Sequence, residues 1–320
     1  MYGFFCNLLK PCVVLFCMRK LLLLLFTAIT FFAQAQTDSL FVTTSDSVKL
    51  FVKRSGSGKP VLFIHGGPGS NSAYFEYSGG NMFEKDAQLI YLDQRGCGRS
   101  DNASHKDYSL QPLVKDFEEV RIALGIKKWT LMPHSFGGIL ATEYAYQHPA
   151  SIASMVYLNC TIDVNASAKS GIAKTIEMLP GIKAEDKAFL TADSINLFER
   201  WFASFGMLDK AGLRYQLFFD SKEADSLHSD VTQKFAHHWE LQQNVWNHPE
   251  YFVSFAPKTA SLKMPVLIIG GTRDYTIGTD HPRLMQFPKA QVVYIGGGHA
   301  LYMEHGAELY KAVTPFLRKG

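Results

Sequence analysis

The chain has 320 residues, of which 47% are hydrophobic and 19% are charged. This composition excludes a disordered or collagen-like chain, because so much apolar side chain can be buried to offset the entropy lost on folding. The length allows one large domain, or one domain with an insertion. The 32 Lys and Arg residues outnumber the 29 Asp and Glu residues, which gives a formal net charge of +3.

The positive excess lies in a leader with the pattern of an export signal. Residues 18–20 (Met-Arg-Lys) form a short basic segment, residues 21–32 an unbroken apolar run, and residues 33–35 (Ala-Gln-Ala) a motif typical of signal-peptide cleavage. The apolar run is shorter than the roughly 20 residues that span a bilayer. We therefore predict a cleaved signal peptide over residues 1–35. An uncleaved amphipathic anchor is the alternative, and the start is Met1 or Met18.

Removal of this leader would leave an electrically neutral protein. Lys10, Arg19 and Lys20 are the only charged residues before Asp38, and subtracting these three from 32 leaves 29 basic residues against 29 acidic ones. Together with the lack of basic clusters, this neutrality argues against nucleic acid as a partner. We expect an exported protein, periplasmic or secreted, without stable membrane insertion after cleavage. The sequence does not indicate an oligomeric state.

The cysteines and histidines form neither a disulfide framework nor a metal site. Only Cys97 and Cys160 follow the leader, which is too few for a disulfide scaffold. The chain has no Cys-x-x-Cys pair and no His-Glu-x-x-His motif. His237 and His238 are adjacent, so they point in different directions, and we interpret them as surface or capping residues. We expect no metal and no organic cofactor.

Short β-rich runs alternate with helical patterns after the leader, which predicts a mostly parallel sheet covered by helices. The repeat of Leu110, Leu113, Phe117, Val120 and Leu124 predicts the buried stripe of an amphipathic helix. Further helices are expected to end near residue 147 and to run from residue 307 to about 318. The predicted strands are residues 40–44 and 48–53, as an antiparallel hairpin, then 60–64, 88–92, 129–132, 152–158, 265–269 and 292–295.

Roughly residues 163–263 interrupt this alternation. The segment is helical in pattern and rich in aromatic residues, and neither a Gly/Ser-rich or Pro-rich linker nor an internal repeat separates it from the rest. We therefore predict a helical cap over residues 163–263, inserted into a core formed by residues 36–162 and 264–320. Its aromatic side chains would close an apolar pocket over a substrate.

A predicted strand gives way directly to a helix at Ser135. Residues 133–137, Pro-His-Ser-Phe-Gly, match most of the Gly-x-Ser-x-Gly nucleophile elbow, with Pro133 in place of the first glycine. Such a turn strains the backbone of the serine, lifts its hydroxyl above the sheet edge and needs small neighbours. Pro133 is compact, and a strand terminus tolerates its missing N–H. We predict Ser135 as a nucleophile.

A serine hydroxyl needs a base to take its proton and a carboxylate to orient that base. An elbow of this kind is followed along the chain by an acid after a late strand and then by a histidine near the C-terminus. Asp274 and His299 each follow a predicted strand, at the carboxyl edge where α/β sheets bind their ligands. We predict Asp274 as the acid and His299 as the base, ahead of Asp280, Asp163 and His305.

The loop after the strand at residues 60–64 is glycine-rich, with the sequence His-Gly-Gly-Pro-Gly. Acyl transfer needs two N–H donors aimed at the developing negative charge. We predict the amide of Phe136, directly after the nucleophile, and the amide of Gly67, because Pro68 has no donor. The loop matches neither a dinucleotide fingerprint nor a P-loop. His65 is interpreted as a buried histidine that holds the loop.

Three motifs carry a resemblance to a known family. Residues 65–69 (His-Gly-Gly-Pro-Gly), 93–100 (Asp-Gln-Arg-Gly-Cys-Gly-Arg-Ser) and 134–138 (His-Ser-Phe-Gly-Gly), with Asp274 and His299, resemble those of the proline iminopeptidases and their α/β-hydrolase relatives. The resemblance covers essentially the whole chain after the leader. It implies the α/β-hydrolase fold and an aminopeptidase that removes an N-terminal residue, often proline, through an acyl-enzyme. Family members usually carry Gly where Pro133 stands and commonly Trp where Phe136 stands.

The resemblance also implies that acidic cap residues bind the free amine of a short peptide substrate. Glu199, Glu240 and Glu250 lie beside cap aromatics and are the candidates, with Trp239 next to Glu240. One alternative is a carboxylesterase or another amidase that acts on small esters or amides, because one fold hosts many substrates. Another is a non-catalytic protein that binds a small molecule under the cap. The order of Ser, Asp and His along the chain argues against this second alternative.

Overall fold

The computed structural model describes residues 38–319. The predicted signal peptide and both candidate start positions lie outside the described residues. Within residues 38–319, no helix is both long and apolar enough to cross a membrane.

Eight strands within residues 38–319 form one sheet, in the order β1-β2-β4-β3-β5-β6-β7-β8. β1 and β2, and β2 and β4, pair in antiparallel fashion, and all other neighbours pair in parallel. The predicted mostly parallel sheet and its opening hairpin are thus confirmed. The strands are β1 (Asp38–Thr43), β2 (Lys49–Gly56), β3 (Pro60–Ile64), β4 (Gln88–Leu92), β5 (Trp129–Ser135), β6 (Ile152–Cys160), β7 (Val266–Gly271) and β8 (Ala290–Ile295).

Helices cover both faces of this sheet. The predicted amphipathic helix is α3 and the predicted C-terminal helix is α12, so both are confirmed. Among residues 38–319, the helices outside the interval between β6 and β7 are α2 (Ala73–Tyr77), α3 (Leu110–Ala123), α4 (Gly137–Gln147), α11 (Leu301–Glu304) and α12 (Gly306–Lys319). Short 3₁₀ helices in the same part of the chain are η1 (Gly80–Lys85), η2 (Ser104–Lys106), η3 (Pro149–Ser151) and η7 (His281–Leu284).

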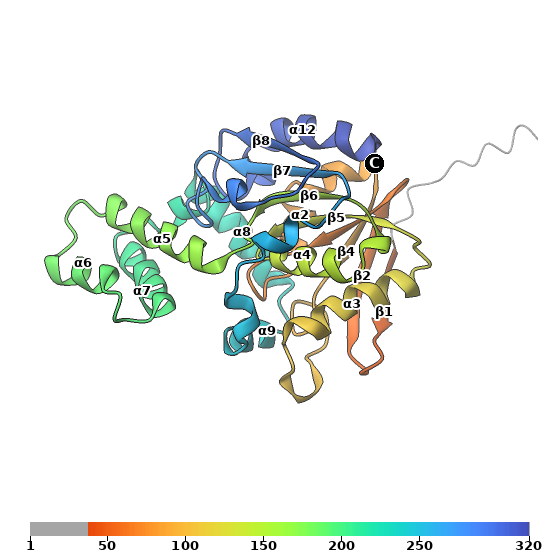
Figure 1. Ribbon diagram of the computed structural model, residues 1–320, viewed down its shortest axis with the longest axis horizontal. Coiled ribbons are helices and arrows are strands. Elements are labelled where there is room, and N and C mark those ends of the chain that lie inside the picture. The colour runs from red at the N-terminus through yellow and green to blue at the C-terminus, as the bar shows by residue number, and fades with distance from the viewer. Residues whose placement is uncertain (1–37, 320) are drawn as a thin grey trace, which may run out of the picture. The chain divides into compact units, whose positions relative to one another are not determined.

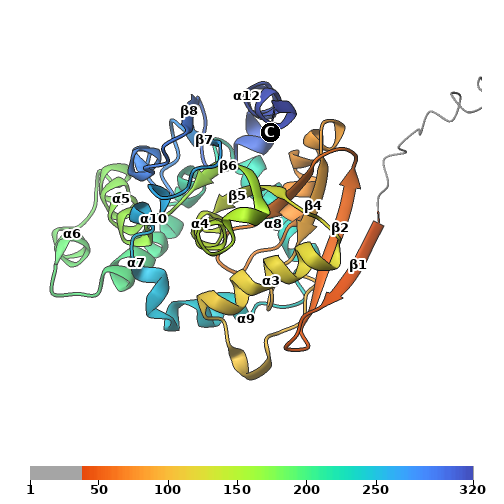
Figure 2. The same cartoon turned by 45° about the vertical axis from the view of Figure 1, so that its right-hand side comes forward.

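Alternation along the central strands places apolar side chains in two layers. On β3, Leu62 and Ile64 belong to the cluster that contains the buried residues of α3 and α4. Val61 and Phe63 point the other way, into the cluster that contains residues of α2 and α12. Both faces of β3 are therefore buried, as expected for a strand inside a parallel sheet. Figure 2 shows α3 and α4 on one side of the sheet and α12 on the other.

All regular elements between β6 and β7, which the structure describes in full, are helical. They are α5 (Val164–Met178), α6 (Ala184–Thr191), α7 (Leu197–Lys210), η4 (Arg214–Leu217), α8 (Lys222–Lys234), α9 (Glu240–Asn244), η5 (Val245–Asn247), η6 (Pro249–Phe252) and α10 (Ala256–Thr259). The name cap is used below for residues 163–263. α5, α6 and α7 form a group of their own at the left of Figure 1. This group has a separate small core of Ala168, Ile172, Leu190 and Trp201.

The second half of the cap is hydrogen-bonded to loops at the carboxyl edge of the sheet. The backbone amides of His237 and His238 both donate to the Gly98 carbonyl, at 3.0 and 3.1 Å. The side-chain amide of Asn71 donates to the Thr232 carbonyl at 3.1 Å. These bonds hold the chain between α8 and α9 over the loops that follow β3 and β4. The two histidines therefore connect the cap to the sheet edge through their backbone.

Candidate active site

The turn between β5 and α4 holds Ser135 in a strained conformation. β5 ends at Ser135 and α4 begins at Gly137, and Ser135 has a φ of 55°, in the left-handed region that non-glycine residues rarely adopt. Space around the turn is tight, since a Cβ on Gly66 would lie 2.6 Å from the Ser135 Cβ. Pro133 pairs with Ile64 of β3, so the strand accommodates this departure from the glycine pattern. The Ser135 residue is 8% exposed.

A carboxylate and an imidazole meet beside this turn. His299, after β8, has its Nδ1 3.0 and 2.9 Å from the two carboxylate oxygens of Asp274, after β7. Asp274 is 1% exposed and His299 is 5% exposed. The Oδ1 of Asp274 also accepts hydrogen bonds from the backbone amides of Thr276 and Ile277, at 3.2 and 3.3 Å. Because its Oδ atoms are engaged, the carboxylate is fixed in orientation and holds the His299 ring with its Nε2 free of hydrogen bonds to residues 38–319.

Asn159 joins the loops that carry Asp274 and His299. Its Nδ2 donates to the Asp274 Oδ2 at 2.7 Å and to the Gly298 carbonyl at 3.1 Å. Asn159 lies near the end of β6, is buried, and has a φ of 47°. Sequence reasoning missed this residue. The signal that could have found it is a polar side chain near the carboxyl end of an otherwise apolar strand.

The turn that carries Ser135 contacts the loop that carries His299 through His134. The Nε2 of His134 donates to the His299 carbonyl at 3.1 Å, and the centroids of the two imidazole rings are 4.7 Å apart. Among the contacts of residues 38–319, no hydrogen bond joins the Ser135 hydroxyl to His299. Bonds of this kind are often long without a substrate. The structure therefore brings Ser135 and the Asp274–His299 pair to one edge of the sheet.

The glycine-rich loop after β3 lies against the turn that carries Ser135. The Cβ position on Gly66 would be 3.1 Å from the Phe136 amide nitrogen. Gly67 has a φ of 121°, which glycine adopts at little cost. Within the described chain, neither the Gly67 amide nor the Phe136 amide donates to another group. Two backbone donors are thus available, one on the residue after Ser135 and one on the residue after Gly66.

His65 is a buried hydrogen-bonding histidine, in agreement with its interpretation from the sequence. Its Nδ1 donates to the Gly66 carbonyl at 3.1 Å, and its Nε2 accepts from the Gln94 amide at 3.1 Å. Burial lowers the pKa of His65 below its ordinary value, so the ring is neutral and keeps this tautomer. The side-chain amide of Gln94 in turn donates to the His65 carbonyl at 2.8 Å. These bonds tie the loop after β3 to the loop after β4.

The alternative candidates for the acid and the base have other partners. Asp163 caps α5, where its Oδ1 accepts from the Ala166 amide at 2.9 Å. Asp280 is exposed and pairs with Arg283 at 2.9 Å. His305 Nε2 lies 2.8 Å from an Asp220 oxygen. None of these contacts, all within the described residues, reaches Ser135.

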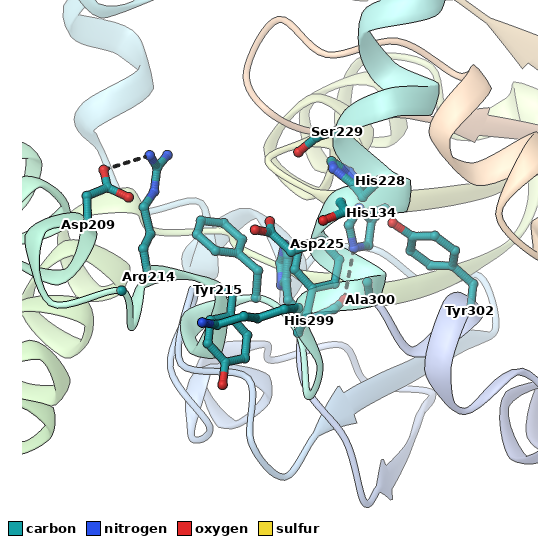
Figure 3. Close-up of a pocket in the computed structure, with 15 residues that line it drawn as sticks. His134, Asp209, Arg214, Tyr215, Asp225, His228, Ser229, His299, Ala300 and Tyr302 are labelled. Atoms are coloured by element: carbon teal, nitrogen blue, oxygen red, sulfur yellow. Dashed lines mark hydrogen bonds and ion pairs between the residues drawn. The ribbon is translucent and has the colours of Figure 1, made fainter.

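A cavity of about 530 Å³ opens beside His299 (Figure 3). Its walls include His134, His299 and residues of the cap, with His228 on α8. Burial and the nearby His299 lower the pKa of His228 to about 4, so this imidazole is neutral at neutral pH. The charged side chains of the lining are Asp209, Arg214, Lys222 and Asp225.

Two of these four charges neutralise each other, and the other two, Lys222 and Asp225, form no ion pair with a described residue; the Lys222 ammonium lies 5.6 Å from the centre of the Tyr215 ring. Asp209 and Arg214 form an ion pair of 3.1 Å at the left of Figure 3. Asp225 lies in the middle of the figure near His299, and its carboxylate has no hydrogen bond or ion pair with any other described residue. An unpaired carboxylate in a cavity is suited to a cationic group of a ligand. Sequence reasoning missed Asp225, which no motif marks.

The cap residues predicted to bind the substrate lie elsewhere. Glu240 Oε2 accepts from the Tyr108 hydroxyl at 2.9 Å. Glu250 Oε1 accepts from the backbone amide of Leu110, the first residue of α3, at 3.1 Å. Glu199 is exposed in the first turn of α7, and Trp239 is 41% exposed. In the part of the chain that the structure describes, none of these four lines the cavity beside His299.

Residues 38–319 contain no group of three His, Cys, Asp or Glu side chains placed to hold a metal ion. Cys97 and Cys160 are free and buried, and burial raises the pKa of both thiols well above the ordinary value. Both thiols are therefore protonated at neutral pH and act as small apolar side chains.

The comparisons with known sequences find proline iminopeptidases among the relatives of this chain. A putative proline iminopeptidase of Mycoplasma genitalium is 40% identical over 117 residues, which cover 34% of this chain and 36% of that protein. The proline iminopeptidase of Neisseria gonorrhoeae is 38% identical over 120 residues, 36% of this chain and 38% of that protein. The matched part of the chain thus spans little more than a third of the length of these curated relatives.

Solved structures and a family model extend the similarity to the whole fold. The proline iminopeptidase of Mycobacterium smegmatis superposes with a TM-score of 0.68 at 21% identity, covering 88% of this chain and 98% of that one. An esterase of Exiguobacterium antarcticum gives a TM-score of 0.64 at 17% identity, covering 88% and 100%. Residues 59–306 match the model of the α/β hydrolase fold. The chain therefore belongs to the α/β-hydrolase family and is similar to the proline iminopeptidases within it.

Proposed function

We propose that the protein is a serine aminopeptidase that releases an N-terminal residue, with proline as the expected one, from short peptides. The observation that carries the proposal is the meeting of strained Ser135 with the buried Asp274–His299 pair at one edge of the sheet. A strained serine and a carboxylate-oriented imidazole are the parts that acyl transfer requires. The similarity to proline iminopeptidases supports the choice of substrate.

In this mechanism the Ser135 hydroxyl oxygen attacks the scissile carbonyl carbon, and its proton passes to His299 Nε2. Asp274 accepts the Nδ1–H of His299 and stabilises the imidazolium that forms. When the C–N bond breaks, the leaving amine takes the proton from Nε2, and the N-terminal residue stays on Ser135 as an ester. Water then attacks the carbonyl carbon of this ester while His299 Nε2 takes a proton from the water. The ester C–O bond breaks, His299 gives this proton to the Ser135 oxygen, and the free N-terminal residue leaves. The scheme requires no metal and no organic cofactor.

The tetrahedral intermediates carry a negative oxygen that needs donors. The amides of Gly67 and Phe136 are free of acceptors among the described residues. Phe136 directly follows Ser135, and Gly67 directly follows Gly66, whose Cβ position would lie 2.6 Å from the Ser135 Cβ. Donors placed before the reaction starts stabilise the charge without reorganisation. We therefore assign these two amides to the oxyanion hole.

The cavity supports a peptide more than an uncharged ester as the substrate. An N-terminal ammonium group can pair with the carboxylate of Asp225, which has no partner in the described chain. An uncharged short-chain ester would leave this partly buried carboxylate unpaired. Asp225 therefore replaces Glu199, Glu240 and Glu250 as the carboxylate that we expect to meet the substrate amine.

The site of action is also a proposal. We propose that residues 1–35 direct export to the periplasm or the medium and are then removed, because their sequence has the order of a signal peptide. N-terminal sequencing of the protein recovered from each cell fraction tests this. A first residue near 36 in the exported fraction is the expected result, and an intact leader on protein in the cytoplasm would contradict it.

The activity is tested with a fluorophosphonate probe and a panel of amino-acyl arylamides and short-chain esters. We expect the wild-type protein to be labelled and to hydrolyse Pro-arylamide, and Ser135→Ala to do neither. Hydrolysis of esters but of no amino-acyl arylamide would identify a carboxylesterase instead. Absence of labelling, or equal labelling of wild type and Ser135→Ala, would overturn the enzyme proposal altogether.

A further inference from the structure

Three of the loops that supply groups to the proposed chemistry are far apart in the sequence. The oxyanion loop (residues 65–69) carries Gly67, the nucleophile turn (residues 134–137) carries Ser135 and Phe136, and the base loop (residues 296–300) carries His299. Such groups act well only when they are held within a fraction of an ångström of the productive geometry. Some contact must therefore fix the three loops relative to one another.

A buried chain of hydrogen bonds does this. The Gly66 amide donates to the Tyr74 hydroxyl oxygen at 3.0 Å, and the Tyr74 hydroxyl lies 2.9 Å from His134 Nδ1. His134 Nε2 lies 3.1 Å from the His299 carbonyl oxygen. Tyr74, His134 and His299 are all buried. The chain therefore runs without a break from the oxyanion loop through the nucleophile turn to the base loop.

The chemistry of these groups allows only one direction for the chain. A carbonyl oxygen only accepts, so the proton of His134 is on Nε2 and its Nδ1 accepts the Tyr74 hydroxyl proton. Burial lowers the pKa of His134 well below its ordinary value and raises that of Tyr74 above it. The imidazole is thus neutral and the phenol is protonated at neutral pH, and each link has one donor and one acceptor.

We propose that Tyr74 and His134 are positioning residues that hold the oxyanion loop and the base loop at a fixed separation across the nucleophile turn. This inference rests on the proposed function, since it gives the link a role in acyl transfer. Neither side chain transfers a proton to the substrate in this scheme. Their effect is on the placement of the Gly67 amide and the His299 ring when the tetrahedral intermediate forms.

The surroundings of Tyr74 allow the link to be cut without emptying the core. The Tyr74 ring packs against Phe63, His228 and Tyr302, with centroid distances of 5.9, 5.2 and 5.9 Å. Tyr74→Phe keeps these ring contacts and deletes only the hydroxyl. Tyr157→Phe is the matched control, because Tyr157 is fully buried and its hydroxyl lies 2.8 Å from the Thr142 hydroxyl on α4, outside the three loops.

The test compares these variants in steady-state hydrolysis of Pro-arylamide and in the rate of fluorophosphonate labelling. For Tyr74→Phe we expect kcat and the labelling rate to fall about 10- to 100-fold with KM within about twofold, because the oxyanion donors act in the transition state. Tyr157→Phe should keep the wild-type kcat. His134→Gln, which keeps a side-chain N–H donor, should retain more activity than His134→Leu.

The outcomes separate this inference from the function on which it rests. If the wild-type protein is not labelled and hydrolyses no substrate of the panel, both the proposed function and the positioning role are overturned. If the wild type is active and Tyr74→Phe matches Tyr157→Phe in kcat and labelling rate, only the positioning role is overturned. If Tyr74→Phe fails to fold, the pair His134→Gln and His134→Leu decides, and equal activity per folded molecule in those two variants overturns the role.

Discussion

The carboxyl edge of the sheet and the cap contribute different kinds of group to the site. At the sheet edge, Asp274 accepts hydrogen bonds from Asn159 and from backbone amides, and His134 is held between Tyr74 and the His299 carbonyl. In the cap, Asp225 faces the cavity without a partner among the described residues. Groups with partners are fixed in place, whereas an unpaired charge is available to a ligand. Variants at the sheet edge should therefore lower kcat, and variants in the cap should change KM.

Asp274→Asn should give the largest effect. An amide in place of the carboxylate no longer stabilises the His299 imidazolium and favours the wrong tautomer, so kcat should fall about 10⁴-fold. Steady-state hydrolysis of Pro-arylamide measures the loss. Asp280→Asn is the control, because the exposed Asp280 pairs with Arg283, and it should keep full activity. A larger loss in Asp280→Asn than in Asp274→Asn would show that the acid is misassigned.

Asn159→Gly should come next, with a fall in kcat of about 10- to 100-fold and little change in KM. Asn159 connects Asp274 to the Gly298 carbonyl, so its loss frees both loops. Glycine is the chosen replacement because the positive φ of 47° at this position suits it without strain. A 10- to 100-fold rise in KM with an unchanged kcat would contradict this role and indicate that Asn159 contributes to substrate binding instead.

Asp225→Asn should raise KM for amino-acyl arylamides by about tenfold, which corresponds to about 1.4 kcal/mol of binding, and leave kcat nearly unchanged. The KM for a short-chain ester, which has no ammonium group, should not move. Asp230→Asn makes the same chemical change on an exposed part of α8 and should leave both values at wild type. If Asp225→Asn changed KM equally for the arylamide and the ester, the proposal that Asp225 binds the substrate amine would be wrong.

The strands and the mostly parallel character of the sheet could be predicted from the sequence because each strand is marked by a local pattern. Continuous apolar runs mark buried parallel strands, and residues that directly follow such runs must gather at one edge. This reasoning led to Ser135, Asp274 and His299, which the structure brings to that edge. It could not lead to Tyr74, whose role depends on the distance of its hydroxyl from His134, a contact between segments 60 residues apart.

The cap was harder to predict because its carboxylates were chosen by their neighbours in the sequence. Glu240 and Glu250 lie beside aromatic residues in the sequence. In the structure, however, both accept hydrogen bonds at the start of α3, Glu240 from the Tyr108 hydroxyl and Glu250 from the Leu110 amide. Asp225 lies on α8, a polar, amphipathic helix, and no sequence pattern distinguishes it from the other acidic residues of that helix. Several carboxylates of the cap have the sequence pattern of solvent-exposed residues. Which of them faces the cavity depends on how α8 packs against the rest of the protein, and this packing is a property of the tertiary structure.

The smallest predicted effect concerns the junction of sheet and cap. The buried His281 accepts a hydrogen bond from the Ile162 amide through Nε2 at 2.9 Å, and burial lowers its pKa to about 4. Between pH 6.5 and about 4 the unfolded chain binds a proton here that the folded chain does not, so the free energy of unfolding falls as the pH drops.

The free energy of unfolding falls by up to about 1.4 kcal/mol for each pH unit between pH 6.5 and about 4. His281→Gln removes this titration and should show a smaller fall in Tm between pH 7 and pH 4.5 than the wild type. Activity at pH 7 should stay near wild type after correction for the folded fraction, because His281 is joined to the sheet–cap junction and not to Ser135. An unchanged pH dependence of Tm would mean that the junction is not held by a neutral imidazole.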